Sequence, residues 1–521
     1  MSNKIRILWA DDEIDLLKPQ LFFLEKKDYE VITVTNGHDA LDKLQEDNDI
    51  DVVFLDESMP GLTGLETLSR IKSTLPGIPV VMITKNETEN IMEEAIGSQI
   101  DDYLIKPVNP NQILLSLKKI VDNKKLVKEQ TAKEYMKEIR NIFMDINDNP
   151  DYIKWAEIYK KIISWELRLD ESENSEIKES LDTQKEDANR EFFKYISSNY
   201  LEWIQHNNGP VFSHTLMREK VLPLLSAGKP VIMILMDNLR YDQWKIMEPE
   251  ISELFKITEE DNFYAILPTA TQYSRNAIFA GMLPGDIQKK FPDLWLNDND
   301  EGGKNMHEQA FLENQVSRLV KRDIKLDYTK VTNVVNAKRV ADNALNYTNN
   351  DLTVIVYNFL DMVSHSRTEM EVLKELAGDE KAYRSLTKSW FENSPLYEVF
   401  KKLADRDVQI VVTTDHGTIR VRKPSKVVGD RETTTNLRYK AGRNLQYDKK
   451  DVFEVKNPAD AGLPSPNVST SFIFAKENLF FLYPNNYNQF LNHYTDSYQH
   501  GGVSMEEMIC PVIRLVPKKF S

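Results

Sequence analysis

The chain has 521 residues and a formal net charge of −16, with 66 Lys and Arg against 82 Asp and Glu. This acidic balance argues against a protein that coats nucleic acid or an anionic membrane surface. Cys510 is the only cysteine, which excludes an intrachain disulfide and a four-cysteine zinc site. No apolar run approaches the roughly 18 residues of a membrane span, and the first residues lack the apolar core of a signal peptide. We therefore expect a cytoplasmic protein without membrane insertion.

Residues 1–122 contain five short apolar runs separated by segments of helical length. The runs are IRILWA, YEVITV, DVVFLD, IPVVMIT and DYLIKP. Such alternation predicts a parallel sheet with helices on both faces, an α/β domain of (βα)5 type.

Residues 123–225 lack strand-like runs. Apolar residues recur here at spacings of three and four, which predicts helices near Lys124–Phe143, Asp151–Leu167 and Ile177–Ile204. Asn149–Pro150 and Asp170–Glu176 are expected to separate these helices. We interpret this zone as a helical-bundle linker without a catalytic signature.

Residues 226–521 return to the alternation of strand and helix, which predicts an α/β/α domain. Three buried-strand runs, PVIMILMD, LTVIVYNFLD and VQIVVTTDHG, each lead into an acidic residue. Ligands of open α/β sheets gather beyond the carboxyl ends of the strands, so these endings indicate one site.

In the first zone, a polar residue follows each of several strand ends. A solvated loop charge would explain any one of them, but not the ordered set Asp11, Asp12, Asp56, Thr84 and Lys106. Converging carboxylates favour a hard cation such as Mg²⁺, and a hydroxyl with an ammonium group suits recognition of a phosphoryl group.

The segments WADDE, LDESMPG, ITK and LIKP resemble the receiver domain of bacterial two-component response regulators. The resemblance implies that Asp56 accepts phosphate from a histidine kinase, and that Mg²⁺ is held by Asp11, Asp12, Asp56 and the Ser58 carbonyl. It further implies that Thr84 and Lys106 bind the phosphoryl group, that Tyr103 is an aromatic switch, and that phosphorylated copies form a homodimer through about residues 87–120.

The third zone combines histidines and aspartates at its strand ends. The donors are Asp237, Asp361, His365, Asp415, His416 and His500, a set that could ligate two zinc-like ions. Individually, Asp361 with His365 could be a surface helix pair, and Asp415–His416 could be a turn.

A nucleophile is available in LPTATQYSRNAIFAG, where Thr271 is expected to open a helix. A hydroxyl beside a divalent ion is a better nucleophile at neutral pH. Thr269 competes for this role, and Thr271 could instead be a helix N-cap.

The full set with Thr271 resembles the alkaline phosphatase superfamily, and DNLRYDQ, TATQYSRNAIFAG and HGGVSMEEMICPV resemble its PglZ branch. The resemblance implies two Zn²⁺, one on Asp361, His365 and His500, and one on Asp237, Asp415 and His416 with Thr271. It also implies a phosphothreonine intermediate and, because the similar nucleotide phosphodiesterases use threonine as nucleophile, phosphodiester substrates.

The residues that grip the substrate are less clear from the sequence. Arg240 and Arg275 are candidates for a phosphate-binding arginine. Residues 418–450 hold ten Lys or Arg and three Asp or Glu. This run is either an ordinary solvated loop or a lid that holds an extended anionic substrate through Arg438, Lys440 and Arg443.

The order of the three zones resembles the PorX-like response regulators of the Bacteroidota type IX secretion system. The resemblance implies a PorY-like sensor kinase and a zinc-dependent phosphodiesterase output on a nucleotide or oligonucleotide diester. The alternative is an adaptor whose zinc domain binds a sigma factor or a secretion-motor protein without catalysis. No direct DNA binding is expected, because no helix-turn-helix pattern follows residue 226.

Overall fold

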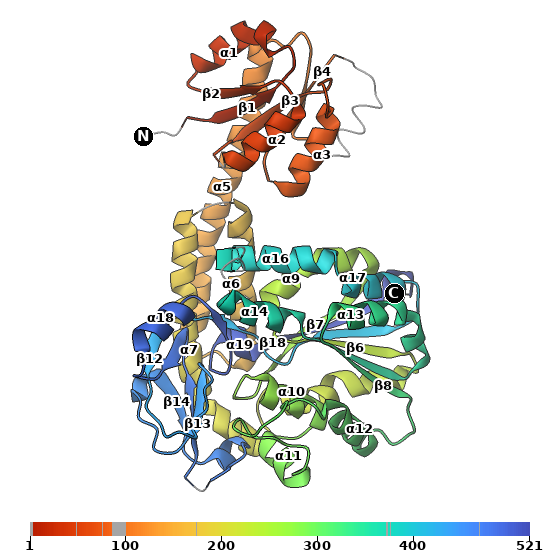
Figure 1. Ribbon diagram of the computed structural model, residues 1–521, viewed down its shortest axis with the longest axis vertical. Helices are drawn as coiled ribbons and strands as arrows, with labels where there is room; N and C mark the ends of the chain where they lie inside the picture. The colour runs from red at the N-terminus through yellow and green to blue at the C-terminus, as the bar shows by residue number, and fades with distance from the viewer. Residues whose placement is uncertain are drawn as a thin grey trace. The chain divides into compact units, whose positions relative to one another are not determined.

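The structure is a computed structural model that describes residues 4–47, 49–75, 77–85, 100–172, 175–370, 374–375, 377–467 and 469–520. The chain divides into two compact units (Figure 1). The first comprises Met1–Met136 with Arg168–Asn174, and the second comprises Lys137–Leu167 with Ser175–Ser521. No helix within the described ranges is long and apolar enough to cross a membrane.

The first unit contains the predicted parallel sheet. Its strands are β1 (Arg6–Ala10), β2 (Glu30–Val34), β3 (Val52–Asp56), β4 (Val80–Thr84) and β5 (Asp102–Ile105), in the order β2-β1-β3-β4-β5. The helices α1 (Lys18–Glu25), α2 (Gly37–Glu46) and α3 (Gly64–Thr74) connect them. A buried apolar cluster lies on each face of the sheet, one around Trp9 and Phe54 and the other around Leu8 and Val53. The start of the expected dimerisation segment, residues 87–99, lies outside the described residues.

Three long helices follow, namely α5 (Pro110–Asn147), α6 (Tyr152–Ser172) and α7 (Ser175–His206). The expected boundary at residues 122 and 123 lies inside α5, which is continuous for 38 residues. The interruption near Pro150 is present, and Asp151 caps α6 by accepting a hydrogen bond from Lys154 N at 2.8 Å.

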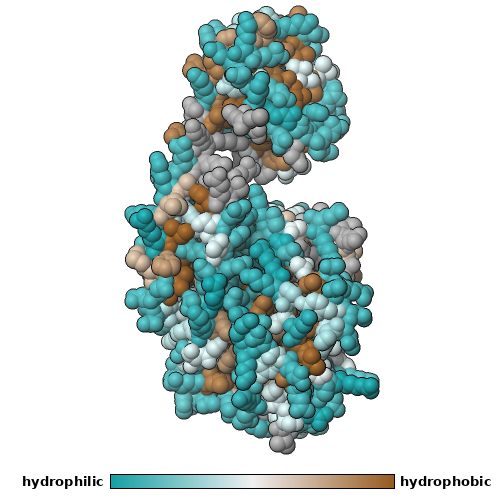
Figure 2. All heavy atoms as spheres, turned by 90° about the vertical axis from the view of Figure 1, so that its left-hand side faces the viewer, coloured by the Kyte–Doolittle hydropathy of each residue, from teal (hydrophilic) through white to brown (hydrophobic). Residues whose placement is uncertain are grey.

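Aromatic side chains fix α6 and α7 within the second unit. Trp155 packs edge-on against Phe192 with ring centroids 5.4 Å apart, and Tyr264 of β7 (Phe255–Tyr264) donates its hydroxyl to Tyr152 O at 2.6 Å. Most of the linker, Lys137–Leu167 and all of α7, is therefore part of the C-terminal unit. The face in Figure 2 is mainly hydrophilic with scattered apolar patches, and exposed apolar side chains of this region include Phe143, Met144 and Ile153.

The core of the second unit is a six-stranded mixed sheet in the order β7-β18-β10-β6-β9-β8. The remaining strands are β6 (Val231–Met236), β8 (Leu326–Val331), β9 (Leu352–Tyr357), β10 (Gln409–Thr413) and β18 (Ile509–Pro517). β10, β6, β9 and β8 are parallel, whereas β18 is antiparallel to both of its neighbours.

Helices cover both faces of this sheet, so the predicted α/β/α architecture is confirmed (Figure 1). One layer contains α9 (Tyr241–Leu254), α13 (Val334–Asp342), α14 (Phe359–Glu369), α16 (Glu380–Glu392) and α17 (Pro395–Leu403). The other contains α10 (Thr271–Ala280), α11 (Pro284–Lys290) and α12 (Glu308–Leu319).

Three small sheets adjoin the large one, and three of their strands come from the basic stretch 418–450. Their strands are β11 (Ile419–Arg420), β12 (Lys423–Lys426), β13 (Tyr439–Gly442), β14 (Val452–Val455), β15 (Ser471–Ala475), β16 (Leu479–Leu482) and β17 (Tyr498–Gln499). The short helices α8 (Ser213–Leu216), α18 (Tyr487–Tyr494) and α19 (Met505–Met508) complete the unit.

Candidate metal centre and phosphorylation site

The carboxyl ends of three adjacent parallel strands bring the predicted aspartates together. Asp237 follows β6, Asp361 lies on α14 just after β9, and Asp415 follows β10. Because β10, β6 and β9 are neighbours in the sheet, these residues meet at one edge. Two groups result, whose candidate ligand atoms lie within 4.8 Å of one another in each: Asp237, Asp415 and His416, and Asp361, His365 and His500.

Thr271 lies at the first of these groups. Its Oγ1 is 3.0 Å from His416 Nε2 and donates a hydrogen bond to Asp237 Oδ1 at 3.4 Å. His416 Nε2 is also 3.7 Å from Asp415 Oδ2. The hydroxyl is therefore held against the same imidazole and carboxylate that the sequence predicts as metal ligands.

The second group is adjacent to the first. Asp361 Oδ1 lies 3.3 Å from His365 Nε2 and 3.9 Å from His500 Nε2. The His500 ring stacks on the His416 ring with centroids 4.3 Å apart. One histidine of each group thus contacts the other, and the two groups form one centre.

Backbone carbonyls orient both stacked imidazoles. His416 Nδ1 is 3.0 Å from Gly417 O, and His500 Nδ1 is 3.1 Å from Thr269 O. A carbonyl can only accept, so each Nδ1 carries the proton and each Nε2 presents its lone pair to the centre. This is the arrangement that metal-binding histidines usually have.

Burial shifts the pKa values of these groups. Burial raises the pKa of Asp237 well above its usual range, and Arg275 opposes this shift. Burial lowers the pKa of His500 to about 3, assisted by the neighbouring His416. Burial also opposes the charge of Asp361, but the hydrogen bond from His365 and the nearby histidines outweigh it and lower its pKa. The two stacked imidazoles are therefore neutral at pH 7, as metal ligands must be.

The donor set fits a pair of zinc-like ions. Asp415 Oδ2 is buried and receives no hydrogen bond, so a cation would satisfy it. Each group supplies three nitrogen or oxygen donors, the number that a catalytic zinc site uses while it keeps a position open. Imidazole with carboxylate also favours zinc over magnesium or calcium.

Thr271, rather than Thr269, is the available hydroxyl. Thr269 is fully buried, donates to Gly502 O at 3.0 Å and accepts from Gly501 N at 2.9 Å, so it fixes the His500 loop. The N-cap alternative for Thr271 is wrong, because Ala270 is the N-cap of α10 and has no capping side chain. The N–H groups of Thr271 and Gln272, which no side chain caps, therefore face an anion-binding position beside Thr271.

Arg275 supports the centre from behind. Its guanidinium is buried and donates to Asp237 Oδ2 at 2.8 Å, Glu308 Oε1 at 2.7 Å and Asn358 Oδ1 at 3.3 Å. These contacts hold the outer oxygen of Asp237 while Oδ1 faces Thr271. Arg275 is thus engaged by protein groups, contrary to the expectation that it grips a phosphate.

The structure also corrects the expectations for Arg240 and Arg438. Arg240 is 2% exposed and pairs with Asp242 and Glu380 at 2.6 Å, whereas Arg438 is fully buried and pairs with Glu507 at 2.7 Å. Their charges are neutralised in the interior.

The remaining candidates of the basic stretch do not form an open cationic lid. Burial lowers the pKa of Lys440 to about 7, and its Nζ donates to Thr434 O at 3.0 Å. Arg443 pairs with Asp430 at 3.2 Å and with Glu432 at 2.7 Å. Both side chains are therefore engaged by protein groups, so neither is a free cation for a substrate.

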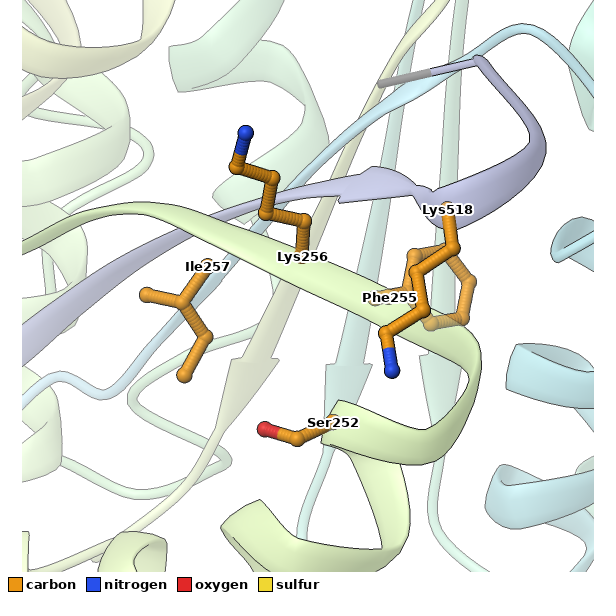
Figure 3. A pocket seen from close by; sticks show the side chains of 5 residues that line it. All are labelled: Ser252, Phe255, Lys256, Ile257 and Lys518. Atoms are coloured by element: carbon orange, nitrogen blue, oxygen red, sulfur yellow. The ribbon is translucent and has the colours of Figure 1, made fainter.

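Two hollows lie outside the centre. One of about 570 Å³ beside β7 is lined by Ser252, Phe255, Lys256, Ile257 and Lys518, and holds none of the predicted site residues (Figure 3). The other, of about 240 Å³, extends from Tyr273 to Arg443, and its walls contain the carboxylates of Asp298, Asp300, Asp430 and Glu432. Such walls disfavour the phosphate groups of an anionic substrate.

The receiver site also assembles as its motif predicts. The carboxylates of Asp11, Asp12 and Asp56 lie together, and Lys106 Nζ pairs with Asp11 Oδ2 at 2.9 Å and Asp56 Oδ1 at 2.8 Å. Burial raises the pKa of Asp56, an effect that Lys106 opposes and Asp11 increases. A magnesium ion would relieve that repulsion.

The other receiver residues lie around this group. Thr84 donates its hydroxyl to Glu57, and Ser58 is exposed two residues beyond Asp56. Tyr103 is 41% exposed, so its ring has room to change position.

Sequence reasoning missed residues that support the loops of the candidate metal centre. Glu308 pairs with Arg275 and with Lys330 Nζ at 3.1 Å, and Asn305 donates to Thr271 O at 3.0 Å. Neither residue follows a strand or belongs to a recognisable motif. Their roles depend on side-chain packing across the fold, which the sequence pattern does not reveal.

Comparison with known proteins identifies three segments. Residues 216–515 match the family described as the BREX system PglZ alkaline phosphatase-like domain, 125–204 match the PorX response regulator linker domain, and 7–118 match the response regulator receiver domain. The first match covers more than half of the chain. Alkaline phosphatase-like domains are typically metal-dependent, and receiver domains bind Mg²⁺.

Curated relatives match the receiver segment. The transcriptional regulatory protein ResD of Bacillus subtilis is 30% identical over 120 residues, or 23% of this chain and 49% of ResD. The response regulator SaeR of Staphylococcus aureus is 29% identical over 128 residues, or 25% of this chain and 55% of SaeR. The chain spans about half the length of these relatives.

Among solved structures, a response regulator receiver domain from Clostridium thermocellum is 32% identical, with a TM-score of 0.23, and the match covers 23% of this chain and 98% of that one. The chain belongs to the PglZ family of alkaline phosphatase-like domains, and it joins this domain to a response regulator receiver domain through a PorX response regulator linker domain.

Proposed function

We propose that the chain is a phosphorylation-controlled response regulator whose output domain is a zinc-dependent phosphodiesterase. The observation that carries this proposal is the position of Thr271, whose hydroxyl contacts Asp237 and His416 at the start of α10. The second group of three ligands lies beside it through the stacked His416 and His500 rings.

Two zinc ions would be held by Asp237, Asp415 and His416 and by Asp361, His365 and His500. When bound, such a pair offsets the negative charge that develops on the attacking and leaving oxygens of a phosphoryl transfer. The Thr271 hydroxyl loses its proton to water as its oxygen attacks phosphorus; the new O–P bond forms while the bond to the leaving alkoxide breaks, and the alkoxide takes up a proton. The N–H groups at the start of α10 favour the negative charge of the substrate phosphate. Water then hydrolyses the phosphothreonine.

The engagement of Arg275 favours a diester over a monoester. A monoester carries one more negative charge at neutral pH, and its recognition needs an additional cation. The guanidinium of Arg275 is occupied by Asp237, Glu308 and Asn358, so it does not supply that charge. A nucleotide or oligonucleotide diester remains the proposed substrate class.

The input is phosphorylation of Asp56 by a sensor histidine kinase. Lys106 would retain its pairing with the modified residue, because a phosphoryl group adds roughly −1.5 to −2 charge beside it. The match of residues 125–204 to the PorX linker supports a role in type IX secretion, with a PorY-like kinase as partner and the cytoplasm as location.

Release of nitrophenol from bis(4-nitrophenyl) phosphate by the zinc-loaded full-length protein tests this proposal. We expect turnover by the wild type, partial retention in Thr271→Ser, and a loss of at least about 1,000-fold in Thr271→Ala. Thr258→Ala is the matched control. It removes an exposed hydroxyl near the start of β7 that donates to Arg514 O, and its turnover should equal that of the wild type.

Equal turnover in Thr271→Ala and wild type, at equal zinc content, would contradict the proposed mechanism. No turnover in any variant, with zinc bound throughout, would contradict the diesterase and favour the adaptor. In that case Thr271→Ala should also leave secretion intact in cells.

A further inference from the structure

Linker helix α7 contacts the segment that supports the metal-binding loops. Asn189 of α7 accepts a hydrogen bond from Met505 N at 2.9 Å and donates one to Glu506 Oε2 at 3.0 Å. Lys185, one helical turn earlier, pairs with Glu506 Oε1 at 3.3 Å. Asn189 is 4% exposed and Glu506 is 5% exposed, so these contacts are shielded from water.

The same segment, α19, holds both histidine loops. Gly417, next to His416, donates its N–H to Glu507 O at 3.1 Å. Gly502, two residues after His500, donates its N–H to Glu507 Oε1 at 2.9 Å. A Cβ at Gly417 would lie 1.9 Å from Glu506 O, so the loop and α19 are in direct backbone contact. A displacement of α19 therefore displaces both imidazoles.

A buried ion-pair network fixes this contact. Lys185 also pairs with Glu166 of α6 at 3.1 Å, and Arg384 of α16 lies 3.8 Å from Glu166 and 3.0 Å from Asp242. Asp242 in turn pairs with Arg240. Separation of α7 from the domain would leave several of these charges buried without partners, which is strongly unfavourable.

We propose that Asn189 is a positioning residue for the zinc-binding histidines, acting through Glu506 and α19. This inference rests on the proposed function, because it assigns to the linker the support of the same metal centre. Thermodynamic linkage is reciprocal. If the contact of α7 with α19 strengthens metal binding, then metal binding must in turn stabilise α7 in that contact. A change in the linker would thus alter the centre without contact with the substrate.

Paired substitutions in the full-length protein test this assignment. Asn189→Asp places a carboxylate against Glu506 and removes the donor. Glu506→Gln, added to it, supplies a new donor and restores the hydrogen bond with its direction reversed. Asn199→Asp is the matched control on the same helix, where the side chain donates only to Tyr195 O at 2.8 Å.

The primary readout is zinc affinity, measured by competition with a chromophoric chelator. We expect Asn189→Asp to weaken zinc binding about 10- to 100-fold, as loss of an outer-shell partner typically does. The zinc affinity of the double variant should recover to within about 3-fold of the wild-type value, which is near the precision with which affinities of variants can be compared. Asn199→Asp should bind as wild type.

The second readout is hydrogen exchange of the α7 amides around residues 185–189 in the wild type. Zinc should slow this exchange, while the amides of α13, which has no contact of this kind, should not respond. Far-UV circular dichroism confirms that each variant is folded, and the recovery in the double variant separates positioning from general destabilisation.

Wild-type zinc affinity in Asn189→Asp, or a double variant no better than the single one, would overturn the inference and leave the proposed function untouched. A wild-type protein that binds no zinc would overturn both, since the inference depends on that centre.

Discussion

At the residue scale, the centre depends on carboxylates whose two oxygens have different tasks. Asp237 directs one oxygen to Thr271 and gives the other to Arg275. Asp415 Oδ1 accepts a hydrogen bond from Asn238 N at 3.3 Å, whereas Oδ2 receives none from the described residues. Each carboxylate is thus fixed by the protein on one side and left available on the other, which is what a preformed metal site requires.

Removal of Arg275 should be costly. Arg275→Ala leaves Asp237 and Glu308 buried without their shared partner, so we expect the free energy of unfolding to fall by about 3–5 kcal/mol. Arg322→Ala, which removes a half-exposed ion pair with Asp351, should change it by less than about 1 kcal/mol. Urea denaturation of both variants measures the difference, and equal losses would show that Arg275 is not a buried structural charge.

The buried side chain of His214 should make the stability of the folded protein depend on pH. Burial lowers its pKa to about 4 from an ordinary value of 6.5, with a smaller effect from Arg218. The unfolded chain therefore binds a proton more readily than the folded one. The contribution of His214 to the free energy of unfolding is fully present above pH 6.5 and is lost as the pH falls towards 4. Between pH 7 and pH 5 the loss is about 2 kcal/mol.

His214→Gln should remove this part of the pH dependence. Urea unfolding at pH 7 and pH 5 provides the comparison, and the wild type should lose more stability between these values than the variant. Identical losses would mean that His214 has the same pKa in the folded and unfolded chain.

At the element scale, helix α3 packs directly against the phosphorylation site. A Cβ at Gly64, the first residue of α3, would lie 2.4 Å from Asp56 O and 2.9 Å from Glu57 Cα. These are backbone atoms at the end of β3, so they cannot yield without moving Asp56. The position of Asp56 thus depends on the close approach of a helix that has no chemical role.

Gly64→Ala should therefore slow phosphorylation of Asp56 by acetyl phosphate, whereas Gly77→Ala, where a Cβ would meet nothing within 4 Å, should not. A phosphate-affinity gel measures both rates. We expect a decrease of about 10-fold or more for Gly64→Ala, since misplacement by about 1 Å commonly has such effects. Wild-type rates in both variants would contradict the tight packing of α3 on β3.

Most elements, and the clustering of the candidate metal ligands, could be predicted from the sequence because they follow local signals. Short apolar runs marked the strands, and aspartates or histidines after them marked the centre. The boundary expected at residues 122 and 123 lies inside a continuous helix, because helical periodicity continues across it and no breaker interrupts α5.

Substrate-binding residues were less predictable than the ligands. Charge and position in the chain make Arg240, Arg438 and Lys440 candidates, but their burial and pairing arise from contacts with distant residues such as Glu380 and Glu507. Charge in a sequence does not distinguish a free cation from one that neutralises an internal carboxylate.

At the scale of the whole molecule, one helix belongs to both units. Residues of α5 up to Met136 group with the receiver, and those from Lys137 group with the PglZ domain. The end of α6, from Arg168, also groups with the receiver, whereas the rest of α6 and all of α7 group with the second unit. The division between the two units therefore falls within α5 and within α6.

Phosphorylation should also change the oligomeric state. With Mg²⁺ and beryllofluoride, which mimics the aspartyl phosphate, we expect the mass by light scattering to rise from 60.5 kDa to that of a homodimer. Asp56→Asn should remain at the lower mass under the same conditions. A wild-type mass that does not respond would contradict dimerisation as a consequence of phosphorylation.

The most direct test of the central claim is the number of zinc ions that the full-length protein binds at equilibrium. Two three-ligand groups predict two ions per chain in the wild type and in His493→Ala, an exposed histidine on α18. His365→Ala should keep one ion, while Thr271→Ala should keep two and lose turnover. A wild type that binds one ion or none, or His365→Ala that still binds two, would contradict a two-metal centre at these residues.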